Sequence, residues 1–460
     1  MQQEDTISAI ATAGGEAGIG IVRISGRTAL SVADRIFRAK NGKRLSDMES
    51  HRAVYGTVTD DEGRPVDEAM ALVMRSPHSY TKEDVVELQC HGGRLVLRQV
   101  LSMTYRAGAR PAERGEFTKR AFLNGRLDLS QAQAVMDVIQ AKTDSALRAA
   151  EGNLSGKFSE KIREMRNEIL GVIAHLEALI DFPEEDVEDI SLEDARKTVA
   201  GLADRLRKLL QTAHAGQILR EGLMTAIIGR PNVGKSSLLN MLLRTERAIV
   251  TDIPGTTRDS IEEYADIGGV PLRIIDTAGI RATEDRVERI GVEKSREYAK
   301  QAALLLVLFD GSQELSAEDE EILALLEGKQ AILLVNKSDL PQKVDPGILR
   351  QRFPDFPVLP ISTKAENGLE SLQKAILDKV YTTGCDEEET ALVRDEREAH
   401  LLRRVLAHLN EAADAMEHSM DADLISIDLR SAWEILGELV GEMAGEDIID
   451  EIFSQFCIGK

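Results

Sequence analysis

The sequence predicts an α+β N-terminal domain, an all-α helical domain, and an α/β P-loop domain of the Ras-like type inserted into the helical one. Three observations support this fold class. Residues 1–118 mix short apolar runs with glycine turns. A glycine-rich loop at 229–237 follows an apolar run, as a phosphate-binding loop does. Helical apolar spacing lies on both sides of that loop.

The N-terminal part reads as α+β because its strand-like runs are short and separated by turns. These runs are 19–24, 69–74 and 85–88. From residue 158 to 179 the apolar residues step by four and three, which predicts a helix of more than twenty residues. The same steps return from 402 to 416. A single bundle built from both blocks would bury both stripes, although a coiled-coil dimer would also do so.

The expected boundaries follow from these patterns. They are 1–120 for the N-terminal domain, 121–220 for the first half of the helical domain, 221–383 for the inserted domain and 384–460 for the second half.

The loop at 229–237 reads Gly-Arg-Pro-Asn-Val-Gly-Lys-Ser-Ser and lies between a strand-like run, 223–228, and a helix-forming stretch, 237–244. Its glycines allow backbone amides to face phosphate oxygens. The Lys235 amine suits the β- and γ-phosphates, and the Ser236 hydroxyl suits Mg²⁺. Lys235 is therefore a predicted catalytic residue. The predicted phosphate contacts are Asn232, Val233, Gly234, Lys235, Ser236 and Ser237.

Three further motifs follow in the order typical of a guanine-nucleotide site. An Asp-Thr-Ala-Gly segment begins at Asp276, and Asn336-Lys337-Ser338-Asp339 follows an apolar run. The Asp339 carboxylate can accept two hydrogen bonds from guanine, whereas adenine offers no such donor pair. The segment from Thr251 to Asp259 suits a mobile switch. The contacts predicted here are Thr251, Asp252, Ile253, Pro254, Gly255, Thr256, Thr257, Asp276, Thr277, Ala278, Gly279, Asn336, Lys337, Asp339 and Ser362.

Length, charge and cysteine content exclude several classes of protein. The 460 residues suggest about three domains, and a net charge of −22 argues against uniform nucleic-acid binding. Residues 94–126 carry eight bases and two acids, so they form either a solvated face or a site for an anion or RNA. No apolar run is long enough for a membrane span, and no secretory signal is recognised. Three scattered cysteines fit a reducing cytoplasm.

Several motifs outside the nucleotide site narrow the family. They include Gly20–Gly26, Glu87–Gly93 and Gly115–Thr118, and the chain ends Phe456-Cys457-Ile458-Gly459-Lys460. Ile280 follows the Asp-x-x-Gly motif where Ras-like enzymes hold a glutamine. With these features the chain resembles the tRNA-modification GTPases (MnmE, also called TrmE), a branch of the translation-factor-related GTPases.

This resemblance implies ligands for the N-terminal domain. The family binds a tetrahydrofolate one-carbon donor there, 5-formyl- or 5,10-methylene-tetrahydrofolate, and dimerises through that domain. The matching positions are Arg23, Glu87, Arg126 and Lys460, although the family often has lysine in place of Arg126. Cys457 matches a proposed catalytic thiol.

The resemblance also implies how GTP would be hydrolysed. A potassium ion would bind Asn232 with backbone oxygens of Thr251, Ile253 and Thr256, while Ser236 and Thr257 would hold Mg²⁺. The GTPase domains would pair face to face, and Glu288 would position water as a catalytic residue.

The implied function is a cytoplasmic, potassium-activated GTPase that forms GDP and phosphate. It would act as a homodimer with an FAD-dependent MnmG (GidA) family protein, in a heterotetramer or larger complex. Together they would attach an aminomethyl or carboxymethylaminomethyl group to C5 of uridine 34 of tRNA. One alternative is an Era-like ribosome-assembly switch, which would carry a basic RNA-binding module after the GTPase domain. Another is a structural GTPase whose heptad helices assemble.

Overall fold

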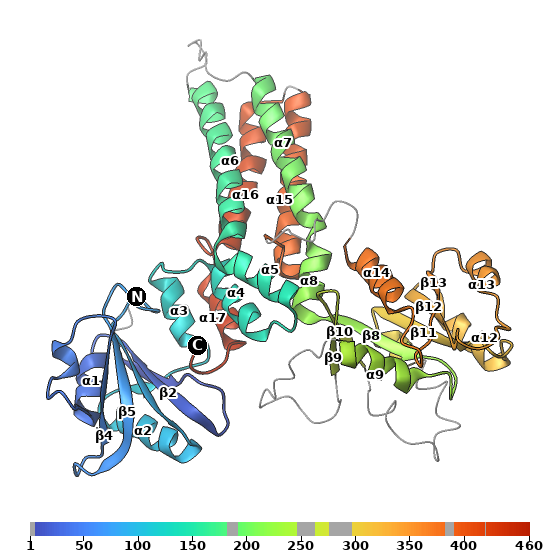
Figure 1. Cartoon of the computed structure of the whole chain (residues 1–460). Helices are drawn as coiled ribbons and strands as arrows, with labels where there is room; N and C mark the ends of the chain where they lie inside the picture. The colour runs from blue at the N-terminus through green and yellow to red at the C-terminus, as the bar shows by residue number, and fades with distance from the viewer. Residues whose placement is uncertain (1–4, 182–191, 246–262, 276–296, 382–390, 419) are drawn as a thin grey trace. The chain divides into compact units, whose positions relative to one another are not determined.

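The computed structural model describes residues 5–181, 192–245, 263–275, 297–381, 391–418 and 420–460 (Figure 1). The chain forms two compact units, one made of Met1–Met136 with Gly437–Lys460 and the other of Asp137–Leu436. Each unit is considered separately. The first unit includes both 121–136 and the last 24 residues, which the sequence patterns place in the helical domain. The expected domain boundaries remain predictions.

The first unit contains a sheet of seven described strands in the order β3-β4-β5-β6-β2-β1-β7. Its pairs are antiparallel except for β1 with β7. The predicted runs at 19–24, 69–74 and 85–88 all lie in strands. The strands are β1 Ile7–Ile10, β2 Ala17–Ser25, β3 Phe37–Ala39, β4 Arg52–Thr59, β5 Pro65–Met74, β6 Val85–Gly92 and β7 Arg110–Pro111.

Side chains alternate between the two faces of this sheet, and this alternation creates a polar position on β2. Val22 and Ile24 are fully buried in an apolar core that also includes residues of α1 and α2. Arg23 lies between them and therefore points to the other face. In the β2–β6 register Arg23 is directly opposite Glu87. The helices of this region are α1 Ala29–Ile36, α2 Arg94–Arg106, α3 Glu116–Leu123 and the 3₁₀ turn η1 Leu45–Asp47.

The C-terminal residues complete the first unit. Helix α17, Glu446–Ser454, contributes Phe453 to a small apolar cluster with Leu129 and Ala132 of α4, Leu129–Gln140. Ile458 then forms an isolated antiparallel bridge with Arg114. The two ends of the chain's sequence therefore share one fold.

The second unit holds the α/β domain, and here the prediction of an inserted P-loop fold is confirmed. Its six described strands have the order β13-β12-β11-β8-β10-β9, and only β9 is antiparallel to its neighbour. The strands are β8 Leu223–Ile228, β9 Glu263–Ile267, β10 Val270–Ile274, β11 Leu304–Asp310, β12 Gln330–Asn336 and β13 Val358–Pro360. The helices are α9 Lys235–Thr245, α12 Ala317–Leu323, α13 Pro346–Arg352 and α14 Leu369–Val380, with the 3₁₀ turn η2 Ala324–Leu326.

A helical bundle forms the rest of the second unit, and in Figure 1 its long helices run side by side. Helix α7 packs against both α6 and α15. Between α6 and α16, the guanidinium of Arg166 lies 3.9 Å from the ring centroid of Trp433. The helices are α5 Asp144–Leu154, α6 Lys157–Asp181, α7 Leu192–Gln211, α8 Ala213–Glu221, α15 Glu396–Glu417 and α16 Ala422–Leu439.

The helical stretch over 192–221 is interrupted at Thr212, where α7 ends and α8 begins. The Thr212 hydroxyl donates to the Leu209 carbonyl at 2.7 Å and accepts from the Val393 amide at 3.0 Å. This second bond satisfies a backbone group of the segment that returns from the α/β domain. None of the helices in the described ranges is long and apolar enough to cross a membrane.

Candidate functional site

The phosphate loop lies directly after β8, at the end of a buried strand. Gly229 and Gly234 have φ values of +156° and +106°, and Asn232 has φ +63°. A Cβ on Gly234 would lie 2.3 Å from Asn336 Nδ2, so this position requires glycine both for its backbone and for its space. Val233 is buried, whereas Asn232, Ser236 and Ser237 are exposed. The loop therefore presents its polar side chains to solvent, where a ligand would bind.

The amine of Lys235 contacts the backbone of its own loop. Its Nζ donates to the carbonyl oxygens of Gly229 at 2.7 Å and Arg230 at 2.8 Å. Burial lowers the pKa of Lys235 from 10.5 to about 8. A phosphate would supply the negative charge that these carbonyl dipoles only partly replace.

Asn336 joins the phosphate loop to the two loops expected to contact the base. Its Nδ2 donates to the Val233 carbonyl at 2.7 Å and to Thr363 Oγ1 at 3.2 Å, while its Oδ1 accepts from the Thr363 amide at 3.0 Å. Asn336 is only 1% exposed. A single buried side chain thus fixes three segments of the site relative to one another.

The carboxylate of Asp339, which is predicted to bind guanine, is exposed and is oriented by the hydroxyl of Ser362. Ser362 Oγ donates to Asp339 Oδ1 at 2.6 Å and accepts from the Ala365 amide at 3.1 Å. The hydrogen bond from Ser362 lowers the pKa of Asp339, so the carboxylate is ionised and accepts hydrogen bonds. The structure therefore brings Asn336, Asp339 and Ser362 together, as the sequence predicts.

Two ion pairs support the site and were not predicted. Lys337 Nζ lies 2.7 Å from Asp310 Oδ2 at the end of β11, and Asp310 is 4% exposed. Arg230 Nε of the phosphate loop lies 3.4 Å from Asp319 Oδ2, which also caps α12. A carboxylate at the end of an otherwise apolar strand, as at Asp310, is a signal that sequence reading could have used. Asp319 carries no comparable signal.

Part of the predicted nucleotide site lies outside the described residues. This applies to the whole predicted switch, to the Asp-x-x-Gly motif and to the water-positioning glutamate. The residues concerned are Thr251, Asp252, Ile253, Pro254, Gly255, Thr256, Thr257, Asp276, Thr277, Ala278, Gly279, Ile280 and Glu288.

A second site lies on the polar face of the sheet in the first unit. Arg23 Nε donates to Glu87 Oε1 at 2.8 Å, and both side chains are mostly buried at 14% and 13% exposure. The Arg23 guanidinium also lies 5.6 Å from the Tyr80 ring centroid and 5.5 Å from that of Phe117. Arg126 is exposed and stacks on the same Tyr80 ring at 4.7 Å. The cluster combines cations, a carboxylate and flat aromatic surfaces, which suits an aromatic ligand with carboxylate groups.

The C-terminal residues approach this cluster closely. Arg23 Nη1 donates to the Gly459 carbonyl at 3.3 Å, and the Lys460 carbonyl accepts from the Phe117 amide at 3.2 Å. Burial, together with the charge of Arg23, lowers the pKa of Lys460. Cys457 is a free thiol with an exposed side chain. Of the predicted set, Arg23, Glu87 and Lys460 thus lie in one environment. Arg126 contacts the same Tyr80 ring as Arg23. Cys457 lies three residues before Lys460 in the sequence.

Tyr80 and Phe117 were not predicted, although Phe117 lies in the Gly115–Thr118 motif that the sequence singled out.

The basic stretch at 94–126 is partly neutralised. Four of its eight bases form ion pairs: Arg106 with Asp61, Arg110 with Asp5 and Glu116, Lys119 with Asp450, and Arg120 with Asp5, Glu83 and Glu116.

The six-stranded α/β sheet, its phosphate loop and the oriented Asp339 define a P-loop GTPase. Family models match both parts of the chain: the GTP-binding protein TrmE N-terminus over residues 6–126 and the MnmE helical domain over residues 129–457. A tRNA modification GTPase MnmE from Heliobacterium modesticaldum is 51% identical over 463 residues, with 99% of each chain covered. Another, from Geobacillus kaustophilus, is 50% identical over 462 residues, with all of each chain covered. The chain belongs to the tRNA modification GTPase MnmE family.

Among solved structures, the G domain of the FeoB iron transporter of T. maritima matches 34% of this chain and 97% of its own. The identity is 26% and the TM-score is 0.26.

Proposed function

We propose that this protein is a potassium-activated GTPase that takes part in modifying C5 of the wobble uridine of tRNA, with a folate as the one-carbon source. The observation that carries the GTPase part is the buried Asn336, which holds the phosphate loop and the Asp339–Ser362 pair in one site. Family membership supports the part that concerns tRNA.

Three residues of the α/β domain have proposed roles in GTP binding: Lys235, Asp339 and Asn232. Lys235 exchanges its two carbonyl partners for phosphate oxygens, and the ionised Asp339 accepts from the guanine N1–H and amino group. Asn232 is exposed at the tip of the loop, so its side-chain oxygen is free to hold a cation beside the phosphates. A potassium ion there would supply fixed positive charge to the transition state, as an arginine finger does elsewhere. We infer that Ser236 and Thr257 hold Mg²⁺ and that Glu288 positions water.

The cluster in the first unit fits a folate by its chemistry. The Glu87 carboxylate, which pairs with Arg23, can also accept hydrogen bonds from the amino-amide edge of a pterin. The ring of Tyr80 offers a flat face against which an aromatic ligand can stack. Lys460 and Arg126 supply cations for the glutamate carboxylates of tetrahydrofolate. We assign no reaction step to Cys457, which is exposed and close in sequence to these groups.

The remaining proposals rest on the family. The protein acts as a homodimer in the cytoplasm, and an FAD-dependent MnmG (GidA) family protein joins it to modify tRNA. Membership of the MnmE family, with relatives 50–51% identical over the whole chain, argues against the Era-like ribosome-assembly switch.

The deciding experiment measures GTP turnover in KCl and in NaCl, with a titration of 5-formyltetrahydrofolate on the same sample. We expect faster turnover in KCl, by roughly 100-fold, because loss of one fixed positive group at a transition state costs this much. Acceleration without folate binding would support the potassium part of the proposal and contradict the folate part. No acceleration and no folate binding would contradict the whole proposal.

The variant Asn232→Gly sharpens this test. Glycine tolerates the φ of +63° at this position, so the loop keeps its conformation while the side-chain oxygen is lost. We expect the KCl effect to disappear while GDP affinity is retained. Asn232→Asp, which keeps an oxygen, is the matched control.

For the tRNA part, the measurement is the mass of the wobble nucleoside after incubation with the FAD-dependent partner, GTP and folate.

A further inference from the structure

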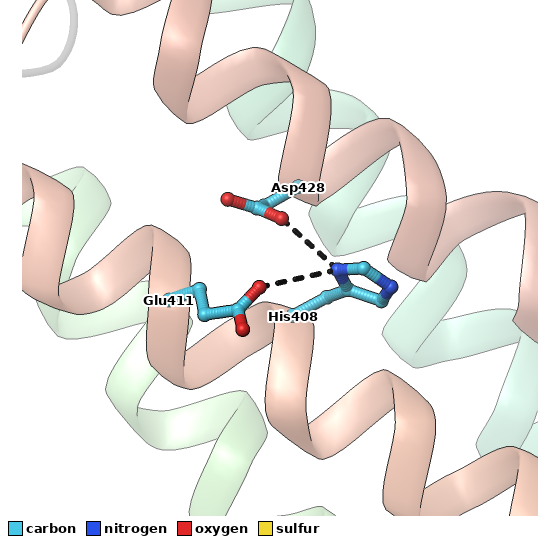
Figure 2. A group of neighbouring side chains, drawn as sticks. All are labelled: His408, Glu411 and Asp428. Carbon is cyan, nitrogen blue, oxygen red and sulfur yellow. Dashed lines mark hydrogen bonds and ion pairs between the residues drawn. The ribbon is translucent and has the colours of Figure 1, made fainter.

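Three side chains on the helical bundle converge on one point outside both sites already considered. His408 and Glu411 lie one turn apart on α15, and Asp428 lies on α16. Figure 2 shows the two carboxylates directed toward the same ring nitrogen of His408. In the part of the chain that the structure describes, this is the one group of three such residues with its ligand atoms close enough to share an ion.

The distances between these atoms are close to those of ligands on one metal ion. His408 Nδ1 lies 3.0 Å from Asp428 Oδ1 and 3.6 Å from Glu411 Oε2, and all three atoms lie within 4.8 Å of one another. Neighbouring ligands bonded at roughly 2.0–2.1 Å in tetrahedral or octahedral geometry are about 2.8–3.4 Å apart. Small side-chain rotations would therefore bring the three atoms onto a common ion, with no change in either helix.

The exposure of the group suits an ion that keeps water ligands. His408, Glu411 and Asp428 are 28%, 64% and 25% exposed, so an ion could reach them from solvent. One imidazole with two carboxylates favours a divalent transition metal such as Zn²⁺ or Co²⁺ over Mg²⁺ or Ca²⁺, which prefer oxygen ligands alone. Two ligands on one helix and the third on the next would make the ion a link between α15 and α16.

We propose that His408, Glu411 and Asp428 form a binding site for a divalent transition-metal ion that joins α15 to α16. Nδ1 of His408 is hydrogen-bonded to Asp428 Oδ1 at 3.0 Å. An ion bound to Nδ1 takes the lone pair of that nitrogen, so the single proton of the neutral ring then lies on Nε2. The site is independent of the proposed nucleotide and folate sites, none of whose residues it uses.

The test is a Zn²⁺ titration of the full-length protein, without an affinity tag, in competition with a chromophoric chelator and in the presence of Mg²⁺. We expect one Zn²⁺ to bind to the wild type. Loss of an outer-shell partner alone typically costs 10- to 100-fold in metal affinity, so His408→Gln should lower it by at least about 100-fold. Glu411→Gln and Asp428→Asn should each weaken it as well.

A matched control and a second readout complete the design. His418→Gln removes an exposed histidine at the end of the same helix, whose Nδ1 contacts the Asp414 carbonyl, and should leave Zn²⁺ binding unchanged. Zn²⁺ should raise the thermal unfolding temperature of the wild type and of His418→Gln but not of His408→Gln. Bound Co²⁺ should give visible absorption in the wild type and in His418→Gln, and this absorption should be lost in His408→Gln.

Two results would overturn the proposal. One is the absence of stoichiometric binding to the wild type. The other is equal affinity in the wild type and in Glu411→Gln, a substitution at an exposed position that leaves the fold intact.

Discussion

Nucleotide affinity should fall as the pH rises above 8, because Lys235 must be charged to bind phosphate. In the free protein this amine is largely buried with two carbonyl oxygens as partners, and its pKa is about 8. Phosphate oxygens would raise that pKa toward its ordinary value, so above pH 8 binding requires uptake of a proton. Affinity is therefore complete below pH 8 and declines above it.

The size of the effect follows from the free-state pKa. About nine-tenths of the protein carries charged Lys235 at pH 7 and about one-tenth at pH 9, so GDP affinity should drop about tenfold over this range, or about 1.4 kcal/mol. Bringing the amine into the folded loop already costs about 3 kcal/mol, from the shift of 10.5 to about 8. The bound phosphates recover this cost.

The assay is equilibrium binding of GDP between pH 7 and pH 9, with Lys235→Met as the control. The variant has no charge to lose, so its weaker binding should change little with pH, and any titration of guanine itself appears equally in both proteins. If the two affinities changed in parallel over this range, a depressed Lys235 pKa could not be the cause.

Three further predictions concern other parts of the chain. Asn336→Ala leaves the buried Val233 carbonyl and Thr363 amide unpaired, so it should lower the free energy of unfolding of this domain by about 2–3 kcal/mol, measured with urea. The exposed Asn240→Ala is its control, and equal stabilities would contradict the role given to Asn336. Gly459→Ala should weaken folate binding but not GTP turnover, because its Cβ would lie 2.3 Å from the Ile10 carbonyl oxygen and its φ is +96°. An unchanged folate titration would show that the C-terminal residues do not shape that site. Glu398 is fully buried and its pKa is raised to about 7, so folding takes up a proton between pH 4.5 and pH 7, and wild-type stability falls as the pH rises through this window. Glu398→Gln should therefore gain up to about 3 kcal/mol relative to the wild type at pH 8 and almost nothing at pH 4, and a difference independent of pH would refute this.

The sequence was most informative where local pattern decides structure. The run 223–228 coincides with β8 because continuous apolar residues are bounded by Gly222 and Gly229. The predicted helix from 158 lies within α6, since its apolar stripe is buried from Phe158 to Leu176. The nucleotide motifs were recognisable for the same reason, because each follows the end of a strand.

Features that depend on distant residues could not be read in this way. The break at Thr212 depends on a hydrogen bond to Val393, which is 181 residues further along the chain. Nor does any local pattern place Lys460 near Arg23, and only the family resemblance suggested it. Tyr80 was missed because a tyrosine in a loop has many ordinary roles.

The joining of distant sequence in the first unit has a consequence for how the protein is made. Arg23 and Gly459 are separated by 436 positions, and Phe453 covers Leu129 and Ala132 from the far end of the sequence. At a ribosomal rate of about 5–20 residues per second, roughly 20 to 90 seconds pass between the synthesis of Arg23 and that of Gly459. During that interval the nascent N-terminal domain lacks Phe453 over its apolar patch and the Gly459 carbonyl beside Arg23. The apolar patch should therefore need chaperone protection during translation, and the Arg23 cluster gains its Gly459 contact only once that residue has been made.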